Sequence, residues 1–289
     1  MKIVDPGFKI IDIPDGEAAL AKIEYLGRIA YKSEDKIDDG RESCKYCPWD
    51  KNEPCTQCND TGYEQVREPS SHKFVRMILK AEQKAKMVLM VEKLIDEDLM
   101  SEDEGLNPVL PGYSEHRQLL SNELVSKVYD YMKENPPHES VIEHCSATVV
   151  FTVDRGISHE LVRHRLAAYT QSSTRYCNYS HNKFGNEITV IKPTFWTDTS
   201  EVTQEWNRAM CNAENHYMAL LKAGAKPQEA RSVLPNSLMT EVAMTANFRE
   251  FRHVFRLRTS KQAHPQMREV MLSLLEEMRN RIPIIFDEL

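Results

Sequence analysis

The chain has 289 residues, of which 41% are hydrophobic and 28% are charged, and its formal net charge is −7. This composition is typical of a globular protein with enough apolar material for a sizeable core. An acidic balance argues against broad nucleic-acid binding, which normally shows as a basic surface. No apolar run approaches the roughly 20 residues of a membrane-spanning helix, and the first residues, MKIVDPGFKI, lack the layout of a secretory signal. We therefore expect a cytoplasmic protein.

The N-terminal half alternates between regular and irregular segments. A short strand followed by a helix is expected over residues 8–32, and an irregular polar segment rich in Cys, Asp, Glu and Pro over 36–71. Apolar residues at steps of three and four predict helices over 72–96 and 119–134, with an acidic loop over 97–113 between them.

The pattern changes at residues 146–154, which read SATVVFTVD. Apolar residues there alternate with Thr and Asp, the period-two signature of a half-buried strand. Gly156 breaks the alternation, and a helix is predicted from Ser158, an acceptable N-cap, through Ala168. A second strand is predicted over 187–192.

The C-terminal third is predicted to be helical over 202–223, 227–245, 248–257 and 264–280. The last of these helices carries a regular apolar stripe that is typical of a core face. Together these elements favour an α+β fold that is mostly helical, with a small antiparallel or mixed sheet.

Four of the seven cysteines form two C-x2-C pairs separated by seven residues, in CKYCPWDKNEPCTQC. Four thiolates at this spacing suit a tetrahedral zinc site that would stabilise the loop 44–58. With all four positions filled by cysteine, such a site has no open position for catalysis. Disulfides and an iron–sulfur site are the alternatives. The predicted ligands are Cys44, Cys47, Cys55 and Cys58.

Residues 161–180 read LVRHRLAAYTQSSTRYCNYS and concentrate positive charge in an acidic chain. A solvated helix face is one interpretation of Arg163 and Arg165. On a helix, however, their side chains would point roughly 200° apart, so at least one should face an interface or a ligand. The following QSSTRY adds hydroxyls and Arg175, which could form a turn or a phosphate cradle.

Arg-His-Arg followed after seven residues by Ser173 resembles the signature of the flavin-dependent thymidylate synthases. The resemblance continues through Arg175-Tyr176 and also covers HESVIEH at 138–144, the stretch 230–258 and AHPQMRE at 263–269. It covers residues 1–35 loosely and 119–289 well. It therefore implies a single catalytic domain over 1–289 that carries an insertion at about 36–118.

The resemblance implies an enzyme that converts dUMP to dTMP with FAD, using methylenetetrahydrofolate as one-carbon donor and NADPH as reductant. It also implies a homotetramer whose sites are shared between subunits. Nucleotide and folate are then the expected partners, and no membrane or nucleic acid is expected.

The site residues carried over by the resemblance fall into two sets. The dUMP set is Glu160, Arg163, Gln171, Ser172, Ser173, Thr174, Arg175, Arg231 and Arg258, and the FAD set is His138, Ser140, Glu143, Arg163, His164, Arg165, Asn247, Arg249 and His253. Arg163, Ser173 and Arg258 are expected to be catalytic, with Ser173 orienting the substrate because the sequence offers it no base partner. Glu160 and His253 stand where some family members carry Gln and Asn.

Two other functions stay open on the sequence. A related flavoenzyme could make another 5-substituted deoxyuridylate, and a zinc-bearing nucleic-acid module could use the arginine cluster on phosphate. Bound flavin would separate the enzymes from the nucleic-acid module.

Overall fold

The computed structural model describes residues 1–29, 32, 34–43, 63–65, 67–79 and 138–289. The chain divides into two compact units. The first comprises Met1–Ala19, Ile142–Asp287 and Leu289, and the second comprises Leu20–Val141 with Glu288. The single catalytic domain over residues 1–289 stays a prediction. Within the described ranges, no helix is both long enough and apolar enough to cross a bilayer.

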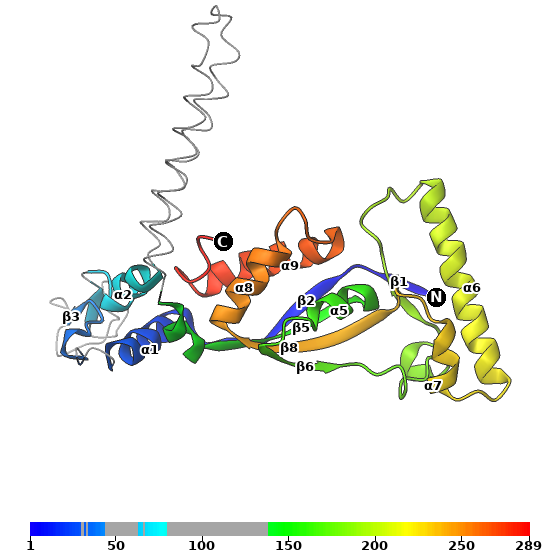
Figure 1. The fold of residues 1–289 in the computed structure, drawn as a ribbon, viewed down its shortest axis with the longest axis horizontal. Coiled ribbons are helices and arrows are strands. Elements are labelled where there is room, and N and C mark those ends of the chain that lie inside the picture. Colours follow the sequence, from blue (N-terminus) through cyan, green and yellow to red (C-terminus); the bar gives the residue numbers. More distant parts are fainter. Residues whose placement is uncertain (30–31, 33, 44–62, 66, 80–137) are drawn as a thin grey trace, which may run out of the picture. The chain divides into compact units, whose positions relative to one another are not determined.

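A four-stranded antiparallel sheet organises the first unit (Figure 1). Its strand order is β2 (Gly7–Asp12), β5 (Ser146–Asp154), β8 (Met239–Asn247) and β6 (Ala167–Gln171). β5 and β8 pair along their whole length, from Ser146 opposite Asn247 to Asp154 opposite Met239. β1 (Lys2–Val4) and β7 (Thr189–Ile191) form a separate parallel pair.

One face of this sheet is buried, as the alternation in the sequence predicts for β5. Ala147, Val149, Phe151 and Val153 are buried on it, and the residues of β8 that share this face are also buried. The helices α8 (Phe248–Arg258) and α9 (Pro265–Arg281) contact each other, and they contact β8 and β2 respectively (Figure 1). The apolar stripe of α9 is buried throughout, so the prediction that it belongs to the core is confirmed.

A smaller apolar cluster lies around the long helix α6 (Glu201–Lys222), which begins at the Ser200 cap. It joins Ile188, Val190, Met210, Tyr217, Ala230 and Leu238. Ala230 ends the short helix α7 (Pro227–Ala230), and the 3-10 turn η4 (Arg231–Val233) follows directly. This cluster fixes the turn that carries Arg231.

In the second unit, the described elements are the continuation of α1 (Gly16–Ile29), η1 (Glu34–Lys36), β3 (Arg41–Ser43), β4 (Tyr63–Gln65), α2 (Ser70–Leu79) and the start of η2 (Glu139–His144). β3 and β4 are antiparallel, with Ser43 opposite Tyr63. Residues 44–62, with the four predicted zinc ligands, lie outside the described residues, as do the predicted helix 119–134 and the end of the predicted helix 72–96.

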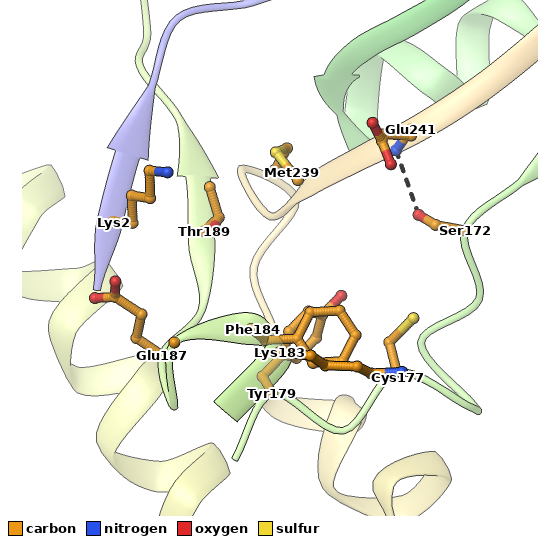
Figure 2. A pocket seen from close by; sticks show the side chains of 11 residues that line it. Lys2, Ser172, Cys177, Tyr179, Lys183, Phe184, Glu187, Thr189, Met239 and Glu241 are labelled. Carbon is orange, nitrogen blue, oxygen red and sulfur yellow. Dashed lines mark hydrogen bonds between the residues drawn. The ribbon is translucent and has the colours of Figure 1, made fainter. Parts of the chain in front are cut away.

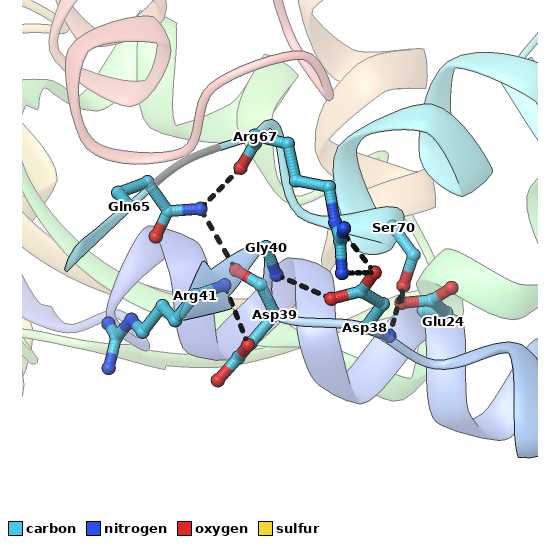
Figure 3. A network of polar contacts seen from close by, with 8 residues as sticks. All are labelled: Glu24, Asp38, Asp39, Gly40, Arg41, Gln65, Arg67 and Ser70. Atoms are coloured by element: carbon cyan, nitrogen blue, oxygen red, sulfur yellow. Dashed lines mark hydrogen bonds and ion pairs between the residues drawn. The ribbon is translucent and has the colours of Figure 1, made fainter. Parts of the chain in front are cut away.

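A polar network ties these elements together (Figure 3). The Asp38 carboxylate accepts from the Gly40 amide at 2.8 Å and from the Arg67 guanidinium at 2.7 and 2.9 Å. The Ser70 hydroxyl donates to Glu24 at 2.7 Å and accepts from the Asp38 amide at 2.8 Å. The Gly40 and Arg67 donors stabilise the ionised form of Asp38 and hold the pKa of that carboxyl below its usual value.

Two expected helices are wrong. The first, Ser158–Ala168, is replaced by the shorter α5 (Arg155–Leu161) followed by strand β6. Asp154, not Ser158, is the N-cap, because its carboxylate accepts from the Ile157 amide at 2.7 Å. Arg163 and Arg165 therefore lie beyond the helix, and the inference drawn from their angle on a helix does not apply.

The second wrong helix is 227–245, where the helical residues of α7 and η4 end at Val233 and β8 begins at Met239. Pro235 lies between η4 and β8, and the stretch from Thr240 to Ala246 alternates buried residues with exposed or half-buried ones. Pairing with β5 and β6 satisfies the backbone groups of β8 on both sides, so the tertiary ladder outweighs the local helical preference.

Candidate active site

The turn between α5 and β6 carries the first arginines of the signature. The Arg163 amide donates to the Glu160 carbonyl at 3.2 Å, and the His164 amide donates to the Leu161 carbonyl at 3.2 Å. The Tyr169 hydroxyl shares its one proton between the carbonyl oxygens of Leu161 and His164, each 2.9 Å away. Burial raises the pKa of Tyr169 to about 12, so the hydroxyl stays a donor. The turn is thus fixed from the strand that follows it.

His164 turns inward while its neighbours face solvent. Its ring is 5% exposed, whereas Arg163 and Arg165 are exposed. Arg258, at the end of α8, donates from Nε to His164 Nε2 at 3.0 Å. The same guanidinium donates from Nη1 to the Glu160 carboxylate at 2.9 Å and from Nη2 to the Glu160 carbonyl at 3.2 Å. Arg258 therefore joins a polar cluster with Glu160 and His164, from which it is separated by more than ninety positions in the sequence.

His164 is neutral at physiological pH. Burial, followed by the positive charge of Arg258 and the nearby His253, lowers the pKa of His164 from 6.5 to about 4. A neutral ring agrees with the geometry, because Nε2 must be unprotonated to accept from an arginine that always donates. His253 lies edge-on to this ring, with centroids 5.9 Å apart.

The end of β6 is held by a layer of hydroxyl groups. The Gln171 amide donates to Ser158 Oγ at 2.9 Å and to Thr240 Oγ1 at 3.1 Å, and Ser172 Oγ lies 2.9 Å from Thr240 Oγ1. Ser158 and Thr240 are buried. Because the Gln171 amide is engaged with them, any ligand contact from Gln171 depends on its remaining carbonyl oxygen.

A cavity of about 380 Å³ opens beside Ser172 (Figure 2). The Glu241 amide donates to Ser172 Oγ at 3.3 Å at its edge. The lining mixes cationic, acidic and aromatic side chains, and it includes the half-buried thiol of Cys177. The lining residues are Lys2, Ser172, Cys177, Tyr179, Lys183, Phe184, Gly185, Glu187, Thr189, Met239 and Glu241.

Ser173 begins a tight turn, and its carbonyl accepts from the amides of Tyr176 and Cys177 at 3.1 and 2.9 Å. Its hydroxyl accepts from the Arg175 amide at 3.3 Å and has no histidine or carboxylate partner among the residues that the structure describes. A hydroxyl without such a partner is not activated for nucleophilic attack, and the orienting role of Ser173 stays a prediction. The next residue, Thr174, is buried and accepts from Arg231 Nη1 at 3.3 Å.

Three arginines of the signature carry uncompensated charge. Across the described ranges, Arg163, Arg165 and Arg175 form no ion pair with a carboxylate, although the chain as a whole is acidic. Arg175 lies over the exposed ring of Tyr176, 5.5 Å from its centroid. Exposed guanidinium groups without carboxylate partners are suited to phosphate or another anion.

The predicted flavin residues are placed in several environments. The Asn247 side chain caps α8 by accepting from the Glu250 amide at 2.9 Å, and Arg249 pairs with Glu143 on the surface. His253 is exposed on the same helix. His138 and Ser140 belong to the second unit and are both exposed.

Within the first unit, five of the predicted site residues form two groups that are joined by side-chain hydrogen bonds. Glu160, His164 and Arg258 form one, and Thr174 with Arg231 forms the other, with β6 running between the two turns. The assignment of each residue to dUMP or flavin stays a prediction.

Sequence reasoning missed three buried polar residues beside the predicted site residues, Ser158, Thr240 and Glu250, and the half-buried Tyr169. The alternation of residues 240–246 was a signal for Thr240. No local pattern identifies Glu250, because its relation to His164 exists only once the turn that follows α5 lies beside the start of α8.

No group of three or more His, Cys, Asp or Glu side chains in the described part of the chain could hold a metal ion. The three cysteines outside the 44–58 loop differ in burial: Cys145 is buried, Cys177 is half-buried and Cys211 is exposed on α6.

Comparison with known proteins first defines the fold. A crystal structure of PolB from Streptomyces cacaoi, described as a UMP/dUMP methylase bound with 5-Br dUMP, has a TM-score of 0.58 and 16% sequence identity. The match covers 100% of this chain and 96% of that one. A likeness at this identity establishes the fold alone, and it confirms the α+β class.

Sequence comparison then defines the family. The family model described as Thymidylate synthase complementing protein matches residues 17–284. A protein of Geobacter sulfurreducens named flavin-dependent thymidylate synthase is 34% identical over 176 residues, which are 61% of this chain and 74% of the relative. Proteins of the same name from Pyrococcus abyssi and Pyrococcus furiosus are 37% and 35% identical over 147 residues, and the matches span 50% of this chain and 59% of each relative. The chain belongs to the thymidylate synthase complementing protein family.

The low pKa of His164 predicts a specific pH dependence of stability. Its folded-state pKa of about 4 lies below the unfolded value of 6.5, so the unfolded state binds more protons between these pH values. The free energy of unfolding therefore decreases by about 2–3 kcal/mol as the pH falls through this window. Urea unfolding of the wild type and His164→Asn at pH 7 and pH 4.5 should show the wild type losing more. An equal loss would contradict a depressed pKa.

Proposed function

We propose that this chain is a flavin-dependent thymidylate synthase, a methyltransferase that converts dUMP to dTMP. The observation that carries the proposal is the Arg258 guanidinium, which Glu160 and His164 hold in place. The family membership of residues 17–284 and the names of the relatives support the same activity.

The phosphate of dUMP is assigned to the arginines that have no carboxylate partner in the described part of the chain. Arg175 follows directly on Thr174, which accepts from Arg231, so two guanidinium groups flank the turn that begins at Ser173. The Ser173 and Thr174 hydroxyls add donors at the same turn. Charge-assisted hydrogen bonds of this kind fix both the position and the orientation of an anionic group.

The pyrimidine ring is assigned to Arg258. Three of its five N–H groups donate to His164 and Glu160, which leaves two on its terminal nitrogens for a ligand carbonyl oxygen. Methylation at C5 requires negative charge to develop on the ring oxygens. A guanidinium whose orientation is fixed before the reaction stabilises that charge without reorganisation.

The exposed arginines also fit a flavin dinucleotide, because Arg163 and Arg165 offer cationic forks for a diphosphate, and His253 and Arg249 lie exposed on the neighbouring helix α8. When bound, the flavin would supply the hydride that completes the methyl group. The protein contributes binding, orientation and exclusion of water, and no enzyme nucleophile is assigned.

Methylenetetrahydrofolate as one-carbon donor, NADPH as reductant and a homotetramer with shared sites are parts of the same proposal. In an active site shared between subunits, each chain supplies only part of each site. The groups around Arg258 and Arg231 would be two such parts. Light scattering that reports a monomer under assay conditions would contradict the tetramer.

The activity is tested directly with purified protein. We expect the absorbance of a bound flavin, and formation of dTMP when dUMP, methylenetetrahydrofolate and NADPH are added. Identification of the product by mass separates dTMP from another 5-substituted deoxyuridylate. A colourless protein that shifts DNA in a salt-dependent way would instead favour the nucleic-acid module.

Replacement of Arg175 tests the phosphate site. Arg175→Ala should weaken dUMP binding by about 10- to 100-fold, the loss expected for one charge-assisted hydrogen-bond pair, while flavin stays bound. Titration of dUMP against the flavin absorbance measures both. Arg208→Ala, which removes an exposed arginine paired with Glu205 on α6, is the matched control and should bind dUMP normally. Unchanged affinity in Arg175→Ala would remove this residue from the site.

We further propose a structural zinc ion held by Cys44, Cys47, Cys55 and Cys58. The pairing of Ser43 with Tyr63 brings the two ends of the segment together, as a stapled loop needs. Metal analysis of the protein purified under reducing conditions should find one zinc per chain, lost in Cys44→Ser. Iron would indicate the alternative cluster, and no metal would exclude both.

A further inference from the structure

Glu250 is a buried carboxylate that the proposed chemistry does not use. It lies in the first turn of α8, is 6% exposed, and its amide donates to the Asn247 cap at 2.9 Å. A glutamate at this position often reaches back to the amide of the cap residue. Within the described residues the Glu250 carboxylate makes no such bond, and Oε1 lies 3.8 Å from His164 Nδ1.

Glu250 and His164 do not form an ion pair between two charged groups. Burial raises the pKa of Glu250, with His253 opposing this, while the pKa of His164 is about 4. At physiological pH the imidazole is neutral, so the contact joins a carboxylate to the dipole of a neutral ring. The 3.8 Å between Glu250 Oε1 and His164 Nδ1 is too long for a direct hydrogen bond, so Glu250 acts on the ring through its charge.

The tautomer of His164 is the property that this contact controls. Arg258 Nε always donates, so His164 Nε2 must accept and Nδ1 must carry the proton. Nδ1 faces the Glu250 carboxylate, and a negative charge there favours a proton on that nitrogen. The other tautomer would set two N–H donors against each other and release the Arg258 fork from the ring.

We propose that Glu250 is a positioning residue, which holds His164 in the Nδ1–H tautomer and through it aims Arg258 at the nucleotide. The aim at the nucleotide rests on the proposed function, whereas the control of the tautomer does not. Glu250, His164 and Arg258 then form a chain from the start of α8 to its end, closed by Glu160.

The first test measures the tautomer without any ligand. Nitrogen-15 NMR of histidine-labelled protein distinguishes the two ring nitrogens, and His164→Gln assigns the signals. The wild type should show the Nδ1–H form, and Glu250→Gln should show a rise in the Nε2–H form because the amide has no net charge. An unchanged tautomer ratio in Glu250→Gln would overturn the proposal.

The second test measures the coupling of Glu250 to Arg258. Glu250→Gln should weaken dUMP binding about five- to tenfold in the wild type, but less than twofold in Arg258→Lys, which lacks the Nε–H at the ring. Equal losses in both backgrounds would mean that Glu250 does not act through Arg258, and would overturn the aiming role.

Glu24→Gln is the matched control, because Glu24 is also a buried carboxylate, 1% exposed and paired with Arg28. It should lower the melting temperature and leave the His164 tautomer and the dUMP affinity unchanged. Failure of the wild type to bind dUMP would contradict the proposed function, and the tautomer measurement would still decide the role of Glu250.

Discussion

The arrangement of the candidate site depends on one guanidinium group. Arg258 is shared between the Glu160 carboxylate, the Glu160 carbonyl and the ring of His164, which join the end of α8 to the end of α5. An arginine held on three of its N–H groups has lost most of its rotational freedom before any ligand arrives. A cation fixed in this way can stabilise charge at one place, which a mobile surface arginine cannot do.

The neutral ring of His164 lowers the electrostatic free-energy cost of this arrangement. Arg258 already brings a positive charge into a partly buried cluster, and a protonated imidazole beside it would repel that charge. The ring therefore serves as an acceptor. Glu160 supplies compensating charge, and the buried Glu250 carboxylate faces the opposite side of the ring. Charge, tautomer and hydrogen-bond direction agree throughout the cluster.

The chain as a whole is acidic, yet three of its arginines form a local cationic cluster. Carboxylates are abundant, with 44 Asp and Glu against 37 Lys and Arg, but within the described part of the chain none of them pairs with Arg163, Arg165 or Arg175. Exposed guanidinium groups without a carboxylate partner are suited to an external anion, as the proposed dUMP and flavin sites require. The hydroxyl layer of Ser158 and Thr240 behind β6 holds the segment that displays them.

The residues and their order along the chain were sufficient to predict several features. The alternation of residues 146–154 predicted β5 with its bounds, the stripe of 264–280 predicted a core helix, and the spacing of the arginines and Ser173 predicted the family. These signals are local, because the period of an amphipathic element and the spacing of a motif are properties of neighbouring residues.

Only the tertiary structure decided the rest. Residues 239–247 form a strand because β5 and β6 pair with them on both sides. The helix α5 ends at Leu161 because the Tyr169 hydroxyl and the pairing of β6 with β8 satisfy the backbone groups that follow. The relation of Arg258 to Glu160, and of Glu250 to His164, joins residues more than eighty positions apart. The sequence by itself determined which charged groups the protein possesses; packing decided which of them meet, because a contact between distant segments has no local pattern.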